Sequence, residues 1–103
     1  MKELKTKTNQ ELDDIFANEV LGHEWKSNVN PTADHNVVQL GIDRLNELGF
    51  IISIANHLGG NKIIDVLNTE NKMDMVFSEW SYEFKSALRA ITIACIVAVR
   101  SKT

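Results

Sequence analysis

The chain has little of what marks a secreted disulfide protein or a cysteine enzyme. Its 103 residues contain a single cysteine, so no disulfide framework exists and a reducing, cytoplasmic setting is expected. That cysteine, Cys95, lies in an apolar run, where burial would raise the pKa of the thiol and limit its access. We therefore predict an inert core thiol rather than a nucleophile.

Recognisable catalytic and metal-binding motifs are also missing from the sequence. The three histidines, His23, His35 and His57, show no short His-x-x-x-His spacing, and no Cys-x-x-Cys or Gly-x-Ser-x-Gly sequence is present. We predict no catalytic residue, no metal and no cofactor, and hence a protein that is not an enzyme. A hydrolase with a dispersed acid/base pair, such as His57 with Asp65, is the alternative that motif analysis leaves open.

Charge and hydropathy argue against two further classes of partner. Eleven basic residues stand against fourteen acidic ones, giving a net charge of −3, and the basic residues are scattered except for Lys2, Lys5 and Lys7. Nucleic acid is therefore disfavoured, because it usually needs a clustered basic face. The apolar run from Ala90 to Val99 would span about 15 Å as a helix, half of the roughly 30 Å hydrocarbon layer of a membrane. We expect a buried helix there and no membrane partner.

A capping box opens the first predicted helix. Thr8 precedes Glu11 by three residues, so the threonine hydroxyl can accept from a free backbone amide while the Glu11 carboxylate accepts from the cap amide. The helix should continue to Gly22, where glycine favours the left-handed stop. Residues 23–31 lack helical periodicity and predict a loop, in which a short edge strand at residues 23–27 stays open.

The segment from Asp34 to Leu67 gives the clearest pattern in the chain. Thr32 or Asp34 caps a helix, and Gly41 within it permits the close approach of a neighbour. The pattern predicts a helix that ends at Gly49, strands at residues 50–55 and 62–67, and a glycine hairpin at residues 56–61. Both faces of the first strand are mostly apolar, so we expect helices to cover both of its sides.

The last third of the chain predicts one more strand and one long helix. Residues 73–78 alternate in polarity, which is typical of a third antiparallel strand. A helix is expected from Ser78 or Ser81 to about Arg100. Its C-terminal half is apolar on every side, which in a small domain indicates a sheet on one flank and a second chain on the other. We therefore predict a homo-oligomer formed through this helix.

The predicted elements add up to one α+β domain. Their order is α-α-β-β-β-α, and the expected arrangement is a small antiparallel sheet of about three strands packed between helices. No repeat, low-complexity tract or Pro/Gly-rich linker divides the chain. We predict a flexible N-terminal tail over residues 1–7 and a single sandwich domain over residues 8–101.

Three stretches of the chain resemble the phage ABA-sandwich domain family, small phage-encoded proteins named for helices on either side of a sheet. Residues 11–22 are similar to the family's opening helix, which closes on a glycine. Residues 31–35, together with the helix end at 48–50, are similar to its second helix and the turn into the sheet. Residues 87–94 resemble its alanine-rich last helix. The chain departs from the pattern between Gly22 and Pro31, where a longer aromatic and proline-containing segment is expected.

The aromatic residues Trp25, Trp80 and Tyr82 lie outside the core stripes, where they either cap the ends of the fold or stack on a ligand. With the phage resemblance, this implies an accessory factor that counters host defence. We expect an oligomer that sequesters a small nucleotide-like signal; the alternative is an inhibitor that binds a host defence protein directly. The predicted ligand-binding residues are Trp25, His57, Asn61, Trp80, Tyr82 and Arg89.

Overall fold

The computed structural model describes residues 2–22, 29–70 and 74–102. In chain order the elements are α1 (Lys2–Lys5), α2 (Asn9–Ile15), the π-helix η1 (Phe16–Leu21), α3 (His35–Glu47), β1 (Phe50–Asn56), the 3-10 turn η2 (Leu58–Gly60), β2 (Lys62–Asn68), β3 (Asp74–Trp80), the 3-10 turn η3 (Ser81–Phe84) and α4 (Ala87–Arg100). The three strands form one antiparallel sheet in the order β1-β2-β3. The predicted α+β class with a three-stranded antiparallel sheet is confirmed.

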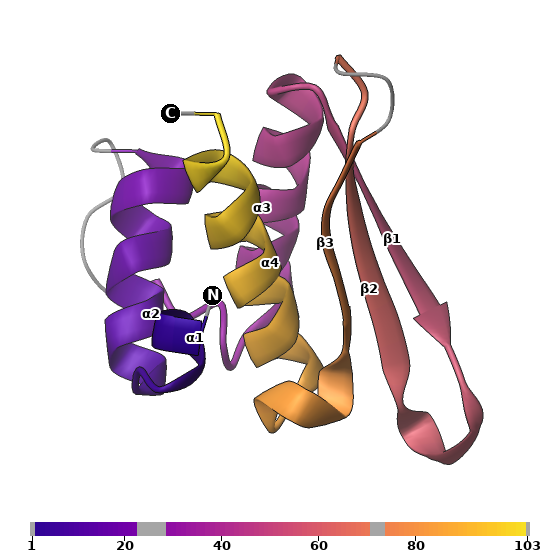
Figure 1. Cartoon of the computed structure of the whole chain (residues 1–103). Helices are drawn as coiled ribbons and strands as arrows, with labels where there is room; N and C mark the ends of the chain where they lie inside the picture. The colour runs from indigo at the N-terminus through magenta and orange to yellow at the C-terminus, as the bar shows by residue number, and fades with distance from the viewer. Residues whose placement is uncertain (1, 23–28, 71–73, 103) are drawn as a thin grey trace.

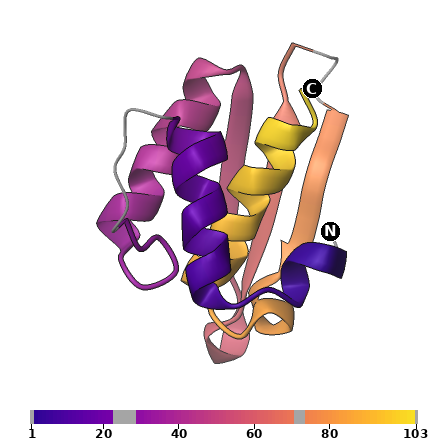
Figure 2. The ribbon, with the colours of Figure 1, turned by 90° about the vertical axis from the view of Figure 1, so that its left-hand side faces the viewer.

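The helices gather on one face of the sheet. Figure 1 shows the sheet at the edge of the molecule, with the helical layer to one side of it, and Figure 2 shows the helices lying in front of the strands. Helix α3 packs against β1, and α4 packs against β2 and β3. The expectation that helices cover both sides of the sheet is wrong for the residues that the structure describes. The first strand is apolar on both faces without being covered on both.

Register and burial together define the two faces. Phe50, Ile64, Val66 and Phe77 are almost fully buried and point toward the helices, so we call this side the inner face. Alternate residues along each strand point the other way. The outer face consists of Ile51, Ser53, Ala55, Ile63, Asp65, Leu67, Met75, Ser78 and Trp80.

Helix α4 is the central element of the helical layer. Besides the sheet, it contacts α2, η1, α3 and η3, and Ile93 and Ile96 are fully buried within the single chain. The apolar circumference of α4 is thus covered by its own domain. The expectation that this helix needs a second chain to cover it is wrong, because α2 and η1 occupy the flank expected to meet a subunit.

The start of α4 differs from the sequence-based expectation. Strand β3 continues to Trp80, which pairs with Ile63 on β2, and the turn η3 follows before any α-helix begins. Lys85 then adopts a left-handed conformation with φ 74°, and the Ser86 side chain caps the helix by accepting from the amide of Arg89 at 3.1 Å. Neither Ser78 nor Ser81 is therefore the cap.

The predicted capping box at Thr8, the glycine that ends the helical segment at residue 22 and the close approach at Gly41 are confirmed, although the predicted single helix changes to the π-helix η1 after Ile15. Both capping-box hydrogen bonds are present: the Thr8 amide donates to Glu11, and the Glu11 amide donates to the Thr8 hydroxyl. Gly22 follows η1 with φ 92°. Gly41 on α3 lies so close to Phe16 that a Cβ atom added there would fall 2.4 Å from the phenyl Cζ. A side chain at position 41 would therefore displace a core ring.

The segment predicted to be a tail is packed onto the domain where the structure describes it. Helix α1 buries Leu4, which is 2% exposed. The Lys5 ammonium lies 4.8 Å from the centre of the Phe84 ring and 4.0 Å from the Glu83 carboxylate. Leu4 supplies apolar area and Lys5 covers an aromatic ring, which explains why residues 2–7 lie against the helical layer instead of projecting from it.

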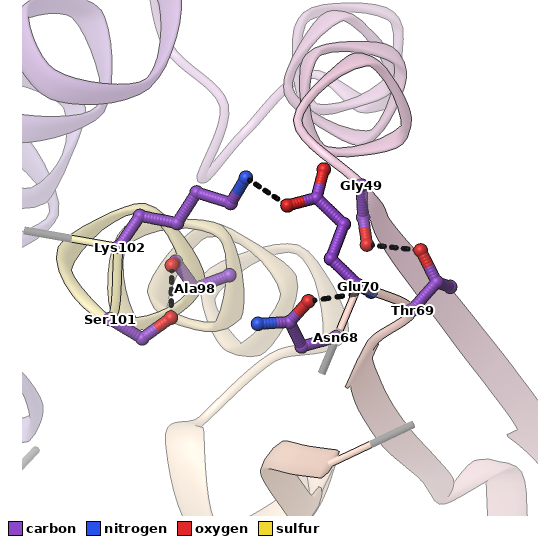
Figure 3. A network of polar contacts seen from close by, with 7 residues as sticks. All are labelled: Gly49, Asn68, Thr69, Glu70, Ala98, Ser101 and Lys102. Atoms are coloured by element: carbon purple, nitrogen blue, oxygen red, sulfur yellow. Dashed lines mark hydrogen bonds and ion pairs between the residues drawn. The ribbon is translucent and has the colours of Figure 1, made fainter. Parts of the chain in front are cut away.

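One end of the sheet is fastened by polar contacts, one of which reaches Lys102, just after the end of α4 (Figure 3). The amide and hydroxyl of Thr69 both donate to the Gly49 carbonyl, at 2.9 and 2.6 Å. The Lys102 ammonium pairs with the Glu70 carboxylate at 3.2 Å. The Glu70 amide also donates to the Asn68 side chain at 3.0 Å. These contacts join α3, β2 and α4 at what we call the fastened end of the sheet.

Candidate functional site: the outer face and the aromatic end of the sheet

The outer face carries three rows of side chains that cross all three strands. Cross-strand pairing aligns Ile51, Leu67 and Met75 in one apolar row nearest the fastened end. A polar row follows, formed by Ser53, Asp65 and Ser78, and a third row consists of Ala55, Ile63 and Trp80. Apolar groups thus lie on both sides of a polar centre.

The apolar part of this face is open to solvent. The Ile51 side chain is 46% exposed and that of Met75 is 55% exposed, although the register places both in the same row. No described helix lies on this side of the sheet (Figure 1). Grouped apolar side chains on an uncovered sheet face mark a contact surface more often than scattered ones do.

Asp65 occupies the middle of the outer face, since it is the central residue of the central strand. One carboxylate oxygen accepts a 2.6 Å hydrogen bond from the Ser78 hydroxyl. Of the strand residues on this face, Asp65 is the one with a charged side chain. Its second oxygen makes no hydrogen bond with the residues that the structure describes.

The other end of the sheet gathers exposed aromatic and apolar groups. The His57 and Trp80 rings meet edge to face with their centroids 4.8 Å apart, and the Trp80 and Tyr82 rings are 6.0 Å apart. Tyr82 is 62% exposed, and Leu58 at the hairpin tip is 96% exposed. Figure 1 shows this hairpin reaching past the helical layer. We call these four residues the aromatic end.

The predicted site residue Asn61 lies beside this cluster and has a structural role there. Its carbonyl accepts from the His57 amide at 2.8 Å, which closes the hairpin around the two glycines. The neighbouring Lys62 donates its amide to the Ser81 hydroxyl at 3.0 Å and its ammonium to the Asn56 side chain. These hydrogen bonds fix the hairpin and the start of η3 at the aromatic end, and they hold the Lys62 ammonium against Asn56.

Arg89 is not at the aromatic end, and its prediction as a ligand-binding residue is wrong. The side chain is 4% exposed. Its guanidinium donates to the Asn9 side chain at 2.7 Å and to the carbonyls of Lys5 and Lys7 at 3.0 and 2.7 Å. Arg89 therefore fastens the N-terminal segment to α4, because those carbonyls need a donor where they are covered.

The carboxylate of Glu79, on the helical side of the same end, has a perturbed pKa. Burial, followed by the hydrogen bond and the charge of Glu83, raises the pKa of Glu79, whereas the positive charge of Lys5 acts in the opposite direction. The ammonium groups of Lys62 and Lys5 are already bonded to Asn56 and Glu83, which disfavours a phosphate group at this end.

Two of the predicted site residues are brought together with His57, and others are not. His57, Trp80 and Tyr82 form the ring contacts described above, and Asn61 adjoins them. Trp25 lies outside the described residues, as do His23 and the candidate edge strand at residues 23–27. The dispersed pair of His57 and Asp65 shows no mutual hydrogen bond: His57 packs on Trp80, and Asp65 accepts from Ser78.

The described residues contain no group of three or more His, Cys, Asp or Glu side chains that could hold a metal ion. Cys95 is completely buried, and burial raises the pKa of its thiol to about 12. Within the ranges that the structure covers, no helix combines the length and the apolar character that crossing a bilayer requires.

Comparison of the chain with protein-family models, with curated proteins and with solved structures gives no match in any of the three.

Sequence patterns did not single out the outer face as a site. They point to Asp65 only as half of an acid/base pair, and they place Ile51 in a sheet covered on both sides. The alternation of β2, in which Ile63, Asp65 and Leu67 share one side, is the signal that reveals this face. A charged residue at the middle of an apolar strand predicts that this side is not buried under a helix.

Proposed function

We propose that this chain is a non-enzymatic binding protein that docks a partner protein on the outer face of its sheet. The observation that carries the proposal is the apolar row of Ile51, Leu67 and Met75, in which Ile51 and Met75 are exposed, on a sheet face that no described helix covers. Buried contact centres in protein complexes are apolar, with a few polar groups that fix the register. The row and the adjacent Asp65 supply both kinds of group.

The resemblance to phage ABA-sandwich proteins extends this proposal to a biological setting. We propose a phage accessory protein that acts in the host cytoplasm and inhibits a host defence protein by direct contact. A net charge of −3 favours a partner with a basic surface.

Loss of the apolar row should remove binding without unfolding the domain. The double variant Ile51→Ser with Met75→Ser is compared with the wild type in pull-downs from a bacterial lysate. Leu58→Ser is the matched control, because it removes an exposed apolar group that lies away from the row. The proposal requires that one protein is captured by the wild type and by Leu58→Ser but not by the double variant. It also requires that this protein, once purified, forms a stoichiometric complex. Equal capture by all three chains would refute it.

The aromatic end favours a second candidate function, the sequestration of a nucleotide-like signal. The rings of His57, Trp80 and Tyr82 offer faces and edges on which a base can stack. We rank it second because Arg89, the arginine among the predicted ligand-binding residues, is buried against the N-terminal segment.

A panel of nucleotides tests the second candidate directly. Sequestration predicts a rise in melting temperature for one member of the panel, recovery of that compound unchanged after heating, and loss of the shift in Tyr82→Ala. Turnover of the compound would instead indicate an enzyme. No shift with any member would remove the nucleotide proposal and leave the docking proposal intact.

A further inference from the structure

The polar centre of the outer face indicates which chemical group a partner must present there. A single carboxylate, Asp65, lies between two apolar rows at the middle of the sheet. The Ser78 hydroxyl bonds one of its oxygens and holds the side chain on this face at 2.6 Å. When a partner covers the face, the carboxylate loses water, so an uncharged cover would leave it unpaired at high cost.

A second copy of this chain does not meet the requirement. Packing two outer faces about a two-fold axis through their centres would bring Asp65 of one copy against the same residue of the other. Two carboxylates in a water-excluded contact repel each other, and neither copy has a basic side chain among the strand residues of this face. The face is therefore not self-complementary.

A cation from the partner does meet the requirement, and the surroundings favour arginine. Trp80 lies on the same face as Asp65, one row away, on the strand next to it. A guanidinium can pair with a carboxylate through two parallel N–H donors while its flat faces lie along an aromatic ring or apolar groups. A lysine ammonium makes the charge contact without the stacking.

We propose that the outer face recognises a protein segment that presents an arginine between apolar side chains. The guanidinium pairs with Asp65, and the apolar neighbours of the arginine cover the row of Ile51, Leu67 and Met75 on one side and Trp80 on the other. This inference rests on the proposed docking function and names the chemistry of its partner.

A peptide selection tests this partner chemistry even while the partner is unidentified. The full chain is immobilised, and a random-peptide display library is panned against it. Recovered peptides are synthesised and titrated into isotope-labelled protein, which locates each one by the shifted amide signals. Each peptide that shifts the amides of β1, β2 and β3 is then remade with lysine or with citrulline, the uncharged isostere of arginine, at its basic position.

We expect the recovered outer-face peptides to contain arginine flanked by apolar residues. Replacement of arginine by citrulline should weaken binding about tenfold, which is typical of a lost charge contact in a partly buried interface, and lysine should be intermediate. In Asp65→Asn, which keeps the shape of the side chain, the arginine and citrulline forms should bind equally. Ser78→Ala should reduce the difference without abolishing it.

Three results would count against the inference, and they differ in what they refute. Outer-face peptides without a basic residue, or citrulline forms that bind as tightly as arginine forms, would overturn the arginine proposal and leave the docking face standing. An undiminished preference for arginine in Asp65→Asn would show that the charge contact lies elsewhere. If no recovered peptide shifts the outer-face amides, both the arginine proposal and the docking function fail.

Discussion

The two faces of the three-stranded sheet differ in burial: helices cover the inner face, and no described helix covers the outer face. On the inner face, Ile64 and Val66 are fully buried beneath α4. Asp65 lies on the outer face of the same strand, the side of the sheet on which no described helix lies. Successive side chains of a strand point to opposite faces of the sheet, so the two faces carry different residues. The placement of the helices decides which of the two faces is buried. The inner face thus provides stability, and the outer face is available for contact.

The largest predicted effect concerns the reactivity of Cys95, whose thiol is buried in the helical layer. Burial raises the pKa of this thiol to about 12, so at pH 8 the reactive thiolate is roughly 2,000-fold rarer than for an ordinary cysteine with a pKa near 8.5. Labelling with a thiol reagent should be slow in the native protein and fast in denaturant. Rapid labelling under native conditions would show that the helical layer opens readily.

Truncation of one apolar residue on each face tests whether only the inner face of the sheet is buried. Ile64→Ala on the inner face should lower the free energy of unfolding by about 3 kcal/mol, because it removes buried methylene groups and leaves a cavity. Met75→Ala on the outer face should cost less than about 1 kcal/mol, since much of that side chain already faces water. Urea unfolding measures both changes. Equal losses would mean that the outer face is covered in solution.

Removal of the Arg89 guanidinium tests whether this side chain holds the N-terminal segment against α4. Arg89→Met should cost about 2 kcal/mol, because the Asn9 side chain and the carbonyls of Lys5 and Lys7 lose their donor. Hydrogen exchange should rise in α1 while the strands keep their protection. Arg89→Lys is the control, since it restores the charge but not the fork of donors. An unchanged α1 in both variants would contradict the role given to Arg89.

The smallest predicted effect is a pH-dependent one on the rim of the helical layer. The bidentate hydrogen bonds from Arg100, at 2.8 and 3.0 Å, lower the pKa of Glu19 from its usual value of 4.5. A carboxylate with a lowered folded pKa stabilises the protein above pH 4.5 and loses that contribution as the pH falls through the folded pKa.

Glu19→Gln should therefore cost less than about 1 kcal/mol at pH 7, as expected for a solvent-exposed pair, and nothing in strong acid. Thermal melting of both chains between pH 2 and pH 7 measures the difference. The outer-face residues serve as the comparison, because Ile51→Ser should show no such pH dependence. A gap between Glu19→Gln and the wild type that stayed constant down to pH 2 would rule out this ion pair as its source.

The sequence determined the elements better than their arrangement. The capping box at Thr8, the close approach at Gly41 and the pairing of residues 50–56 with 62–68 follow from local chemistry, and the structure shows each of them. Placement of α2 beside α4 depends on contacts between distant segments, which periodicity does not encode. The apolar circumference of the last helix therefore indicated burial correctly, but the sequence could not tell whether its own chain or another chain provides the cover.

The candidate site was predictable only in part, for a related physical reason. Large rings outside the core stripes need a contact, which points to His57, Trp80 and Tyr82, and these rings do meet at one end of the sheet. Arg89 was misjudged because a cation near the start of a helix is usually solvated. Its three acceptors come from Lys5, Lys7 and Asn9, at the other end of the chain, so no local pattern announces them.

The fastening of α1 by Arg89 sets an order of events during synthesis. Lys5 and Lys7 precede Arg89 by 84 and 82 residues, so both have left the ribosome long before their donor exists. At about 5 to 20 residues per second, the first segment waits roughly 4 to 17 seconds for the last helix to emerge. The Arg89 contacts that dock α1 therefore form only after the last helix has emerged.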